Sequence, residues 1–362
     1  MKISTVAAPA LGILATLGLN AGCSDELQPS SLGRTSITNA ARNGVSPLAM
    51  GGIDAFAGVG PQRPAHPNHH KPWISPDAKH EHLLLFASDS GLDEVDIYSL
   101  PSFKLRGQLT GFNNPQGMCS DAAGNVYVTQ TNNTEIDKYS HAGKLMARIP
   151  DNYGFPVGCA VDPATGNLAV TDLVNDGSGP GEVEVFSSPS SQPRILTNPN
   201  QYFYYFAGYG PGSKLWVSGM NASGIYMLSR CGASSCSTIS LRGGMLYYPG
   251  AVQWESTQGG WVVFDQMCDD KPAACSYRVS AKGVLGAAST YSNYEGGNDC
   301  DLIQGEIATD HHQYVVGGDY EYCGAAPSTL NRWSYSAGGK PTNYTVLSSK
   351  YSVPNGVAIS AH

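Results

Sequence analysis

The chain has few charged side chains: only 14% of its 362 residues are Asp, Glu, Lys or Arg. The 29 acidic residues outnumber the 21 basic ones, which gives a net charge of −8, and no basic stripe occurs. Because such a stripe is the electrostatic footprint of nucleic-acid binding, we expect no nucleic-acid partner. The low charge and the abundance of Ser, Gly, Asn and Tyr suit the surface of an exported protein instead.

Several signatures of catalysis are also missing. No G-x-S-x-G nucleophile elbow occurs, and His311 and His312 have no visible Ser or Cys partner. There is no C-x-x-C pair and no His at ligand spacing, which argues against a zinc site. Nucleophilic catalysis therefore has no support in the sequence. Nor does any segment between residues 82 and 362 show the pattern of an amphipathic helix.

What the chain does contain is a motif that returns six times: a small or turn residue and Gly, a short strand, a polar turn and a second apolar strand. Its copies begin at Pro115-Gln116-Gly117, Pro156-Val157-Gly158, Phe206-Ala207-Gly208, Tyr248-Pro249-Gly250, Ile303-Gln304-Gly305 and Pro354-Asn355-Gly356. The glycines are 41, 50, 42, 55 and 51 residues apart. Periods of this size are typical of propellers and solenoids.

Each repeat can be divided into four strands, of which the fourth is short and irregular. The turns after the first strand, such as 121–125 and 162–167, carry the Asp, Gly and Asn residues of tight hairpins. The second strand is apolar, with copies at 126–129, 168–171, 215–218, 261–264 and 314–317. The third alternates polar and apolar residues and ends in Ser, with copies at 94–99, 135–140, 182–187, 224–229, 276–280 and 331–334. These patterns predict an all-β domain.

The ends of the repeat array indicate a closed ring. The first copy begins at a second strand, 83–89, and lacks an inner strand of its own, whereas the last copy, 354–360, supplies an inner strand and stops. Joining the two completes a sixth blade and removes the exposed edges of a linear array. We therefore expect residues 80–362 to form one six-bladed β-propeller of four-stranded blades.

The pattern P-x-G…D-x-x-G-N-h-Y-V-T…I-x-x-Y resembles NHL-repeat propellers and, more distantly, the senescence-marker/gluconolactonase and lyase-type propellers. The resemblance covers 80–362 and is clearest in 112–190. It implies a fold more than an activity. In the lactonase-type family a divalent ion, Ca²⁺ or Zn²⁺, sits at the mouth of the channel on carboxylate and Asn ligands, so a metal-dependent lactonase- or lyase-like enzyme is the alternative function.

The positions that precede the six glycines test that alternative. They hold Gln116, Val157, Ala207, Pro249, Gln304 and Asn355. Only Asn355 matches a ligand of the lactonase-type family, and no carboxylate occupies any of the six positions. Asp299, Asp301 and Glu306 are nearby acids, but they belong to a single repeat. We therefore expect no cofactor and lean away from an enzyme, keeping Asn355, Asp299 and Asp301 as the alternative metal ligands.

The amino terminus indicates export. Residues 1–22 have a basic start, an apolar run and small residues before Cys23, the features of a signal peptide. The Ala21-Gly22-Cys23 ending resembles a bacterial lipobox, which implies lipidation of Cys23, although Leu19 lies four rather than three residues before the Cys. Cleavage by an ordinary signal peptidase is the alternative. Residues 23–79, rich in Ser, Pro and Gly, are expected to be a flexible tether.

The cysteine count agrees with export, because eight cysteines remain of the nine when Cys23 is set aside. Cys231 and Cys236, and likewise Cys268 and Cys275, are close enough in sequence to join local hairpins or loops. Cys300 and Cys323 fall in loops of one blade that share a face. Cys119 and Cys159 lie two and one residues after their glycines, so their side chains point in opposite directions and can face each other between neighbouring blades. We expect these four disulfides.

An Asp ends the second strand in four copies: Asp89, Asp172, Asp265 and Asp319. Four copies around a ring would suit a ligand site. However, an Asp at a strand end accepts backbone N–H bonds and shapes its turn, and repetition in blade after blade is what such a structural role predicts. We expect the structural role.

Aromatic residues gather before the inner strands, where the loops should open on one face around the channel. They are Phe112, Tyr153, Phe155, Tyr202, Tyr204, Tyr205, Tyr247, Tyr248, Tyr291, Tyr294 and Tyr351. Amphipathic rings suit a glycan, a peptide or an envelope protein, and packing between blades is the alternative. With Gln116, Gln304 and Asn355 they form the predicted binding site of an exported, monomeric interaction module, which contacts the membrane only through a lipid anchor.

Overall fold

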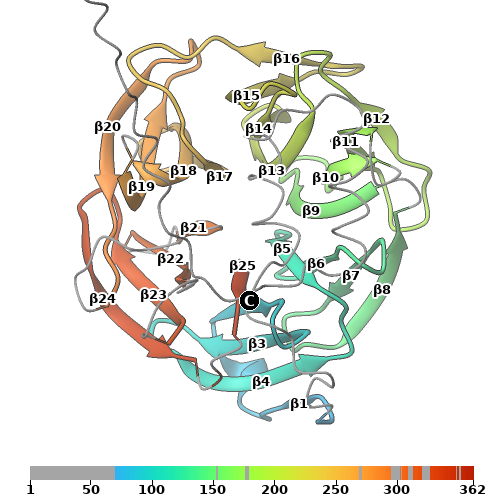
Figure 1. Ribbon diagram of the computed structural model, residues 1–362. Helices are drawn as coiled ribbons and strands as arrows, with labels where there is room; N and C mark the ends of the chain where they lie inside the picture. Colours follow the sequence, from blue (N-terminus) through green and yellow to red (C-terminus); the bar gives the residue numbers. More distant parts are fainter. Residues whose placement is uncertain are drawn as a thin grey trace, which may run out of the picture.

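The computed structural model of the protein describes residues 70–151, 154–175, 179–268, 271–294, 302, 304–308, 313–319, 327–347, 349 and 352–362. These residues form six antiparallel sheets arranged in a ring (Figure 1). Among them, the only helix is one 3-10 turn, Ala78–His80. The all-β, six-bladed propeller that the repeats predict is therefore confirmed.

The first three blades take up the amino-terminal half of the ring. Blade one consists of β1 (Trp73–Ile74), β2 (Leu83–Asp89), β3 (Glu94–Ser99), β4 (Lys104–Thr110) and β25 (Pro354–Ala361). Blade two consists of β5 (Pro115–Ser120), β6 (Val126–Gln130), β7 (Glu135–Tyr139) and β8 (Leu145–Pro150). Blade three consists of β9 (Gly154–Val161), β10 (Leu168–Asn175), β11 (Gly179–Phe186) and β12 (Arg194–Leu196).

The other three blades repeat the same up-and-down order. Blade four consists of β13 (Phe203–Gly210), β14 (Lys214–Met220), β15 (Tyr226–Cys231) and β16 (Cys236–Ile239). Blade five consists of β17 (Pro249–Glu255), β18 (Gly260–Cys268), β19 (Lys271–Val279) and β20 (Leu285–Thr290). Blade six consists of β21 (Gly305–Ala308), β22 (Tyr314–Asp319), β23 (Thr329–Ser334) and β24 (Gly338–Val346).

The ring closes as the repeat ends predict. The carboxy-terminal strand β25 is the innermost strand of blade one and pairs antiparallel with β2, from Leu83 opposite Ala361 to Asp89 opposite Pro354. In Figure 1, β5, β9, β13, β17, β21 and β25 lie nearest the axis. Every repeat motif therefore enters an innermost strand.

Apolar side chains fill the spaces between neighbouring blades. Each of the six junctions has its own core cluster; between blades four and five, Trp216 stacks on Trp261 with ring centroids 4.4 Å apart. A seventh cluster, which includes Tyr205 and Phe206, joins blades three and four near the axis. The strands are thus buried on both faces.

Close packing of the inner strands explains the recurrent glycine. A Cβ atom on Gly208 would lie 2.0 Å from the carbonyl oxygen of Val252 in the next blade. A Cβ on Gly356 would lie 2.2 Å from the carbonyl oxygen of Gln116. Both contacts are far shorter than van der Waals distance, so only glycine fits where neighbouring inner strands meet.

Three of the expected disulfides are present. Cys119–Cys159 joins inner strands β5 and β9 of neighbouring blades. Cys231–Cys236 and Cys268–Cys275 link adjacent strands within blades four and five. The fourth expected pair, Cys300 with Cys323, lies outside the described residues, as do the predicted signal peptide and Cys23. Disulfides of this number are consistent with an oxidising, non-cytoplasmic compartment.

The propeller begins earlier than residue 80. Strand β1 pairs with β4 at the outer edge of blade one, with Trp73 opposite Gln108 and Ile74 opposite Gly107. Ala78 is buried in the core between blades one and two. Blade one therefore has five strands rather than four, and residues 73–79 of the predicted tether are part of it.

Candidate functional site

Four of the predicted contact aromatics lie in the core. Phe112 is only 6% exposed, and Tyr204, Tyr205 and Tyr291 are fully buried. A side chain without exposed area cannot offer a contact surface, so for these four rings the alternative, packing between blades, holds. Phe155, Tyr202, Tyr247, Tyr248 and Tyr294 are half-buried. Tyr153 and Tyr351 lie outside the described residues.

The buried tyrosines also have partners for their hydroxyl groups. The Tyr204 hydroxyl accepts the backbone N–H of Asn198 at 2.6 Å. The Tyr205 hydroxyl lies 3.8 Å from the sulfur of Met220, and the Tyr291 hydroxyl lies 2.8 Å from Ser276 Oγ. These tyrosines therefore stabilise the ring.

The predicted channel amides are engaged with one another and with the backbone. Asn355 Nδ2 donates to Gln116 Oε1 at 2.9 Å and to Ser90 Oγ at 2.8 Å. Gln304 Nε2 donates to the carbonyl of Met118 at 2.7 Å, while Gln304 Oε1 accepts the N–H groups of Met118 and Val357. Gln116, Gln304 and Asn355 are all nearly buried. They connect inner strands of blades one, two and six.

The alternative metal ligands are not assembled by the described residues. Asp299 and Asp301 lie outside them, and Asn355 is engaged as above. Glu306 lines a cavity of about 230 Å³ in the central channel, and its Oε2 accepts the N–H of Ile359 at 2.7 Å. Burial raises the pKa of Glu306 to about 8, so at neutral pH this side chain is largely a neutral acid.

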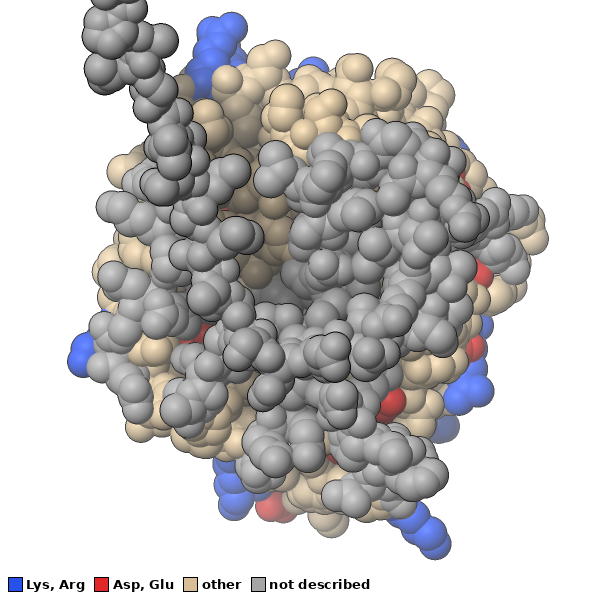
Figure 2. Space-filling view, viewed as in Figure 1, with Lys and Arg blue, Asp and Glu red and all other residues tan. Residues whose placement is uncertain are grey.

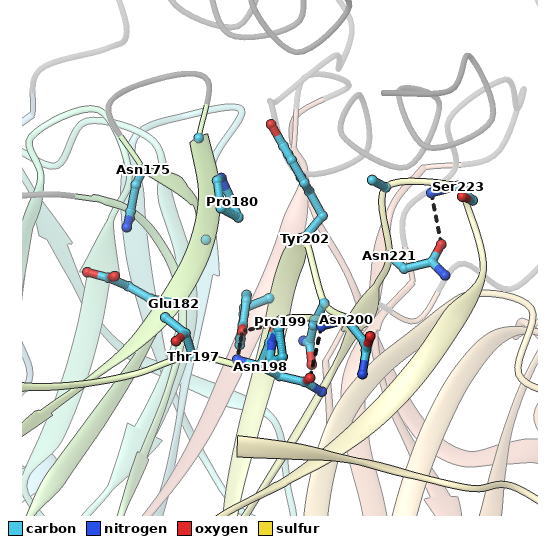
Figure 3. Close-up of a pocket in the computed structure, with 15 residues that line it drawn as sticks. Asn175, Pro180, Glu182, Thr197, Asn198, Pro199, Asn200, Tyr202, Asn221 and Ser223 are labelled. Carbon is cyan, nitrogen blue, oxygen red and sulfur yellow. Dashed lines mark hydrogen bonds between the residues drawn. The ribbon is translucent and has the colours of Figure 1, made fainter. Parts of the chain in front are cut away.

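A pocket of about 710 Å³ lies between blades three and four (Figure 3). One wall comes from the β10–β11 side of blade three, another from the β14–β15 turn, and the floor from the segment that precedes β13. The exposed or half-exposed lining residues are Asn175, Pro180, Thr197, Pro199, Asn200, Tyr202, Asn221, Ala222 and Ser223.

The floor of the pocket is held by a hydrogen-bond network. Asn198 Nδ2 donates to Ser229 Oγ at 2.8 Å and to Thr238 Oγ1 at 3.0 Å. Ser229 Oγ donates to Gln201 Oε1 at 2.5 Å, and Gln201 Nε2 donates to the carbonyls of Phe203 and Ser218. A buried network with satisfied partners is rigid, so the pocket is shaped before any ligand arrives.

The open part of the pocket mixes polar side chains with the apolar surfaces of Pro180, Pro199 and Ala222. Tyr202 stands between the blade-three wall and the Asn221–Ser223 turn (Figure 3). The turn is fixed because Asn221 Oδ1 accepts the N–H groups of Ser223 and Ile225, both at 2.9 Å. Among the described residues that line the pocket, Glu182 is the only charged one, and its carboxyl group is turned away from Tyr202 (Figure 3). In the view of Figure 2, Lys and Arg side chains lie at the edge of the disc.

Of the residues named from the sequence, this pocket contains Tyr202 at its surface and Tyr204 beneath it. Sequence reasoning missed Asn175, Asn200 and Asn221. Two turn signals could have pointed to Asn200 and Asn221, Asn198-Pro199-Asn200 and Asn221-Ala222-Ser223-Gly224, since the antiparallel pairing of β13 with β14 brings these turns together.

The recurrent Asp has the predicted structural role in two of its copies. Asp89 Oδ1 accepts the N–H groups of Gly91, Leu92 and Val353. Asp265 likewise accepts three backbone N–H groups, two of them from the segment that leads into β17. Asp89 fastens the turn after β2, Asp265 holds the backbone of β18 itself at Met267, and both fix the entry to the inner strand.

Comparison with known proteins supports the fold without naming a function. No protein-family model matches the sequence, and no curated protein matches it significantly. No helix in the described part of the chain has the length and hydropathy needed to cross a membrane.

Solved structures do match. A chain from a nidogen–laminin complex superimposes with a TM-score of 0.57 and 14% identity over 77% of this chain and 98% of its own. A protein of unknown function from Bacteroides caccae gives a TM-score of 0.53 and 11% identity, over 78% of this chain and all of its own. A functionally unknown protein from Desulfotomaculum acetoxidans DSM 771 also gives 0.53 and 11%, over 77% and 99%. At these identities the likeness shows shared architecture alone: the chain is a six-bladed β-propeller.

Proposed function

We propose that this propeller is an exported binding module that holds a neutral glycan in the pocket between blades three and four. The observation that carries the proposal is the pocket itself, about 710 Å³ in volume, with a rigid hydrogen-bonded floor and an open wall in which asparagine, serine, threonine and tyrosine stand beside proline and alanine. Among the described residues that line it there is no Lys or Arg. Such a lining favours a ligand without charge.

The chemistry of the open wall suits sugar hydroxyl groups. Asn and Ser side chains both donate and accept hydrogen bonds, as hydroxyl groups do. Tyr202 adds a flat ring with a hydroxyl tip, which can cover the apolar face of a sugar ring at small entropic cost. Because the Asn198–Gln201 floor is already ordered, little freedom is lost there when a ligand binds.

Export is part of the proposal. The three disulfides favour an oxidising compartment, and the amino-terminal sequence has the features of a signal peptide. We propose further that Cys23 is lipidated and tethers the propeller to the envelope. A Cys23→Ser variant should then move from the membrane fraction to the soluble fraction, whereas unchanged fractionation would refute lipidation.

Binding of the full chain to a panel of neutral oligosaccharides, measured by calorimetry, tests the proposed ligand. Tyr202→Ala and Asn221→Ala should each weaken binding of the best oligosaccharide at least about tenfold. Tyr294→Ala is the matched control, since Tyr294 is also a half-buried tyrosine but belongs to the segment after β20. It should leave the affinity unchanged.

Two outcomes would refute the glycan proposal. One is that no oligosaccharide of the panel binds while a protein is captured through the same face; the nidogen–laminin neighbour makes a protein partner the natural competitor. The other is that Tyr294→Ala weakens binding as much as Tyr202→Ala, which would place the site elsewhere on the ring.

A further inference from the structure

Three carboxyl groups lie buried together at the junction of blades two and three. Asp151 follows β8, Asp172 lies in β10 and Glu184 lies in β11. One carboxylate oxygen of each lies within 4.8 Å of the others, and Asp172 and Glu184 are completely buried. Glu182, the cross-strand partner of Asp172, adds a fourth acid beside them. Like charges at this spacing, away from water, repel one another strongly.

Blades one and two also have an acid at the position of Glu184, and there the acid has partners. Asp96 in β3 and Asp137 in β7 occupy equivalent places, opposite Ala87 and Val128 of their second strands, as Glu184 is opposite Val170. Each of these aspartates has a tyrosine hydroxyl as a donor and one further polar or charged partner. Gln108 Nε2 and the Tyr98 hydroxyl donate to Asp96 at 2.8 and 3.0 Å. Arg148 pairs with Asp137 at 3.4 Å, and the Tyr139 hydroxyl donates to it at 3.2 Å.

Blade three has an acid at this position but neither the tyrosine hydroxyl nor the second partner. Phe186 stands where Tyr98 and Tyr139 stand, two residues after the acid. Ile195 pairs with Glu184 where Gln108 pairs with Asp96. Neither oxygen of Glu184 has a hydrogen-bond partner, although the side chain is fully buried and faces Asp151 and Asp172.

Asp172 departs from its repeat in the same way. Asp89 and Asp265 accept backbone N–H groups from the segment that leads into the inner strand, as described above. In blade three that segment's N–H, from Gly154, goes to Asp151 Oδ1 at 2.8 Å. Neither oxygen of Asp172 accepts a hydrogen bond, and none of the ion pairs among the described residues includes Asp172 or Glu184.

The backbone is fitted closely around these acids. A Cβ atom on Gly154 would lie 2.1 Å from the carboxyl carbon of Asp172, so only glycine lets the backbone at the start of β9 lie against that side chain. Asp151, at the end of blade two, holds the N–H of this Gly154, and its carboxyl group thereby lies beside the two acids of blade three.

From this arrangement we infer that Asp151, Asp172 and Glu184 bind a divalent cation, of which calcium fits best. The three side chains offer only oxygen ligands, which are the ligands of hard cations, and the two cysteines of the neighbouring inner strands are joined in a disulfide. The cation takes the place that Arg148, Gln108 and the tyrosine hydroxyls hold in the other blades. Being drawn from blades two and three, the site fastens one blade to the next.

The test uses the purified, oxidised full chain after treatment with EDTA. We expect it to take up one Ca²⁺ per chain by calorimetry and elemental analysis, and its melting temperature to rise by several degrees. Mg²⁺ should bind at least about tenfold more weakly, because it requires a tight octahedral shell. Glu184→Gln and Asp172→Asn should each weaken Ca²⁺ binding at least about tenfold.

Two comparisons separate a cation site from a merely structural cluster. Asp96→Asn, the equivalent position in blade one, should bind Ca²⁺ as the wild type does. Without Ca²⁺, Glu184→Gln should melt at a higher temperature than the wild type, because it removes a like charge; a defect in folding would have the opposite sign.

Four results would overturn the inference: no uptake of Ca²⁺ by the wild type at millimolar concentration, wild-type affinity in Glu184→Gln, equal loss in Asp96→Asn, or equal affinity for Mg²⁺. In the first case the buried acids share protons instead of a cation.

Discussion

At the scale of single residues, Glu306 in the central channel makes the stability of the protein depend on pH. Its carboxyl group is buried, with a pKa raised from 4.5 to about 8 by burial, although the N–H of Ile359 favours the charged form. Between these two values the native protein holds a proton that the unfolded chain has released. Stability must therefore fall as the pH rises from about 4.5 to about 8.

Replacement of this side chain by Gln should remove its share of that dependence. We expect the free energy of unfolding of Glu306→Gln to change less between pH 5 and pH 8 than that of the wild type, by at most about 1.4 kcal/mol per pH unit. Urea denaturation at each pH measures the difference. Parallel pH profiles for the two proteins would show that Glu306 titrates normally.

The copies of the recurrent Asp differ in how well the sequence alone predicts their hydrogen-bond partners. Backbone acceptance at Asp89, which ends β2, follows from strand-end chemistry and is predictable, and Asp265 inside β18 accepts backbone groups in the same way. The different surroundings of Asp172 are not predictable, because its missing donors depend on Asp151 of the neighbouring blade, which takes the N–H of Gly154. Equivalent positions of a repeat share a backbone, but their partners are set by neighbours that the repeat does not specify.

At the scale of elements, the inner strands tolerate no added atom where they meet. Gly208→Ala would place a Cβ 2.0 Å from the carbonyl oxygen of Val252, so we expect a loss of about 2 kcal/mol or more in the free energy of unfolding. Gly286→Ala in the outer strand β20 is the control, because its nearest neighbour would be 3.4 Å away. Equal losses in urea denaturation would contradict the packing explanation.

The disulfides should contribute unequally to the free energy of unfolding, because they close loops of different length. Cys119–Cys159, with a sequence separation of 40, restricts the unfolded chain more than Cys231–Cys236, with a sequence separation of 5. Loop entropy gives about 4 kcal/mol for the first and about 2 kcal/mol for the second. Paired Cys→Ser variants, compared by chemical denaturation, measure this order. A larger loss for the short loop would show that native packing, not chain entropy, dominates.

The strands could be predicted from the sequence, whereas the surface of the site could not. Period-two alternation and the turn residues located β3 (Glu94–Ser99) at its exact bounds. Residues 203–206 are interpreted from the sequence as an exposed loop, but they belong to β13, an inner strand that is buried on both faces. Tyr204 and Tyr205 therefore lie in the core and not on a contact surface. The pocket escaped prediction because its wall from blade three and its two turns from blade four come together only when the ring forms.

At the scale of the whole molecule, closure by β25 makes the ring a rigid frame in which each binding feature lies between blades. The candidate pocket joins blades three and four, and the inferred cation site joins blades two and three. Function in this account therefore depends on the junctions of the ring rather than on its central channel.

Hydrogen exchange of the full chain, with and without a saturating neutral oligosaccharide, tests this most directly. The account predicts slower exchange in residues 197–202 and 221–225, which line the pocket or hold its turn, and no change in β24 or in the inner strands of blades one and six. Protection confined to the channel strands, or spread over blade six with the pocket unchanged, would contradict it.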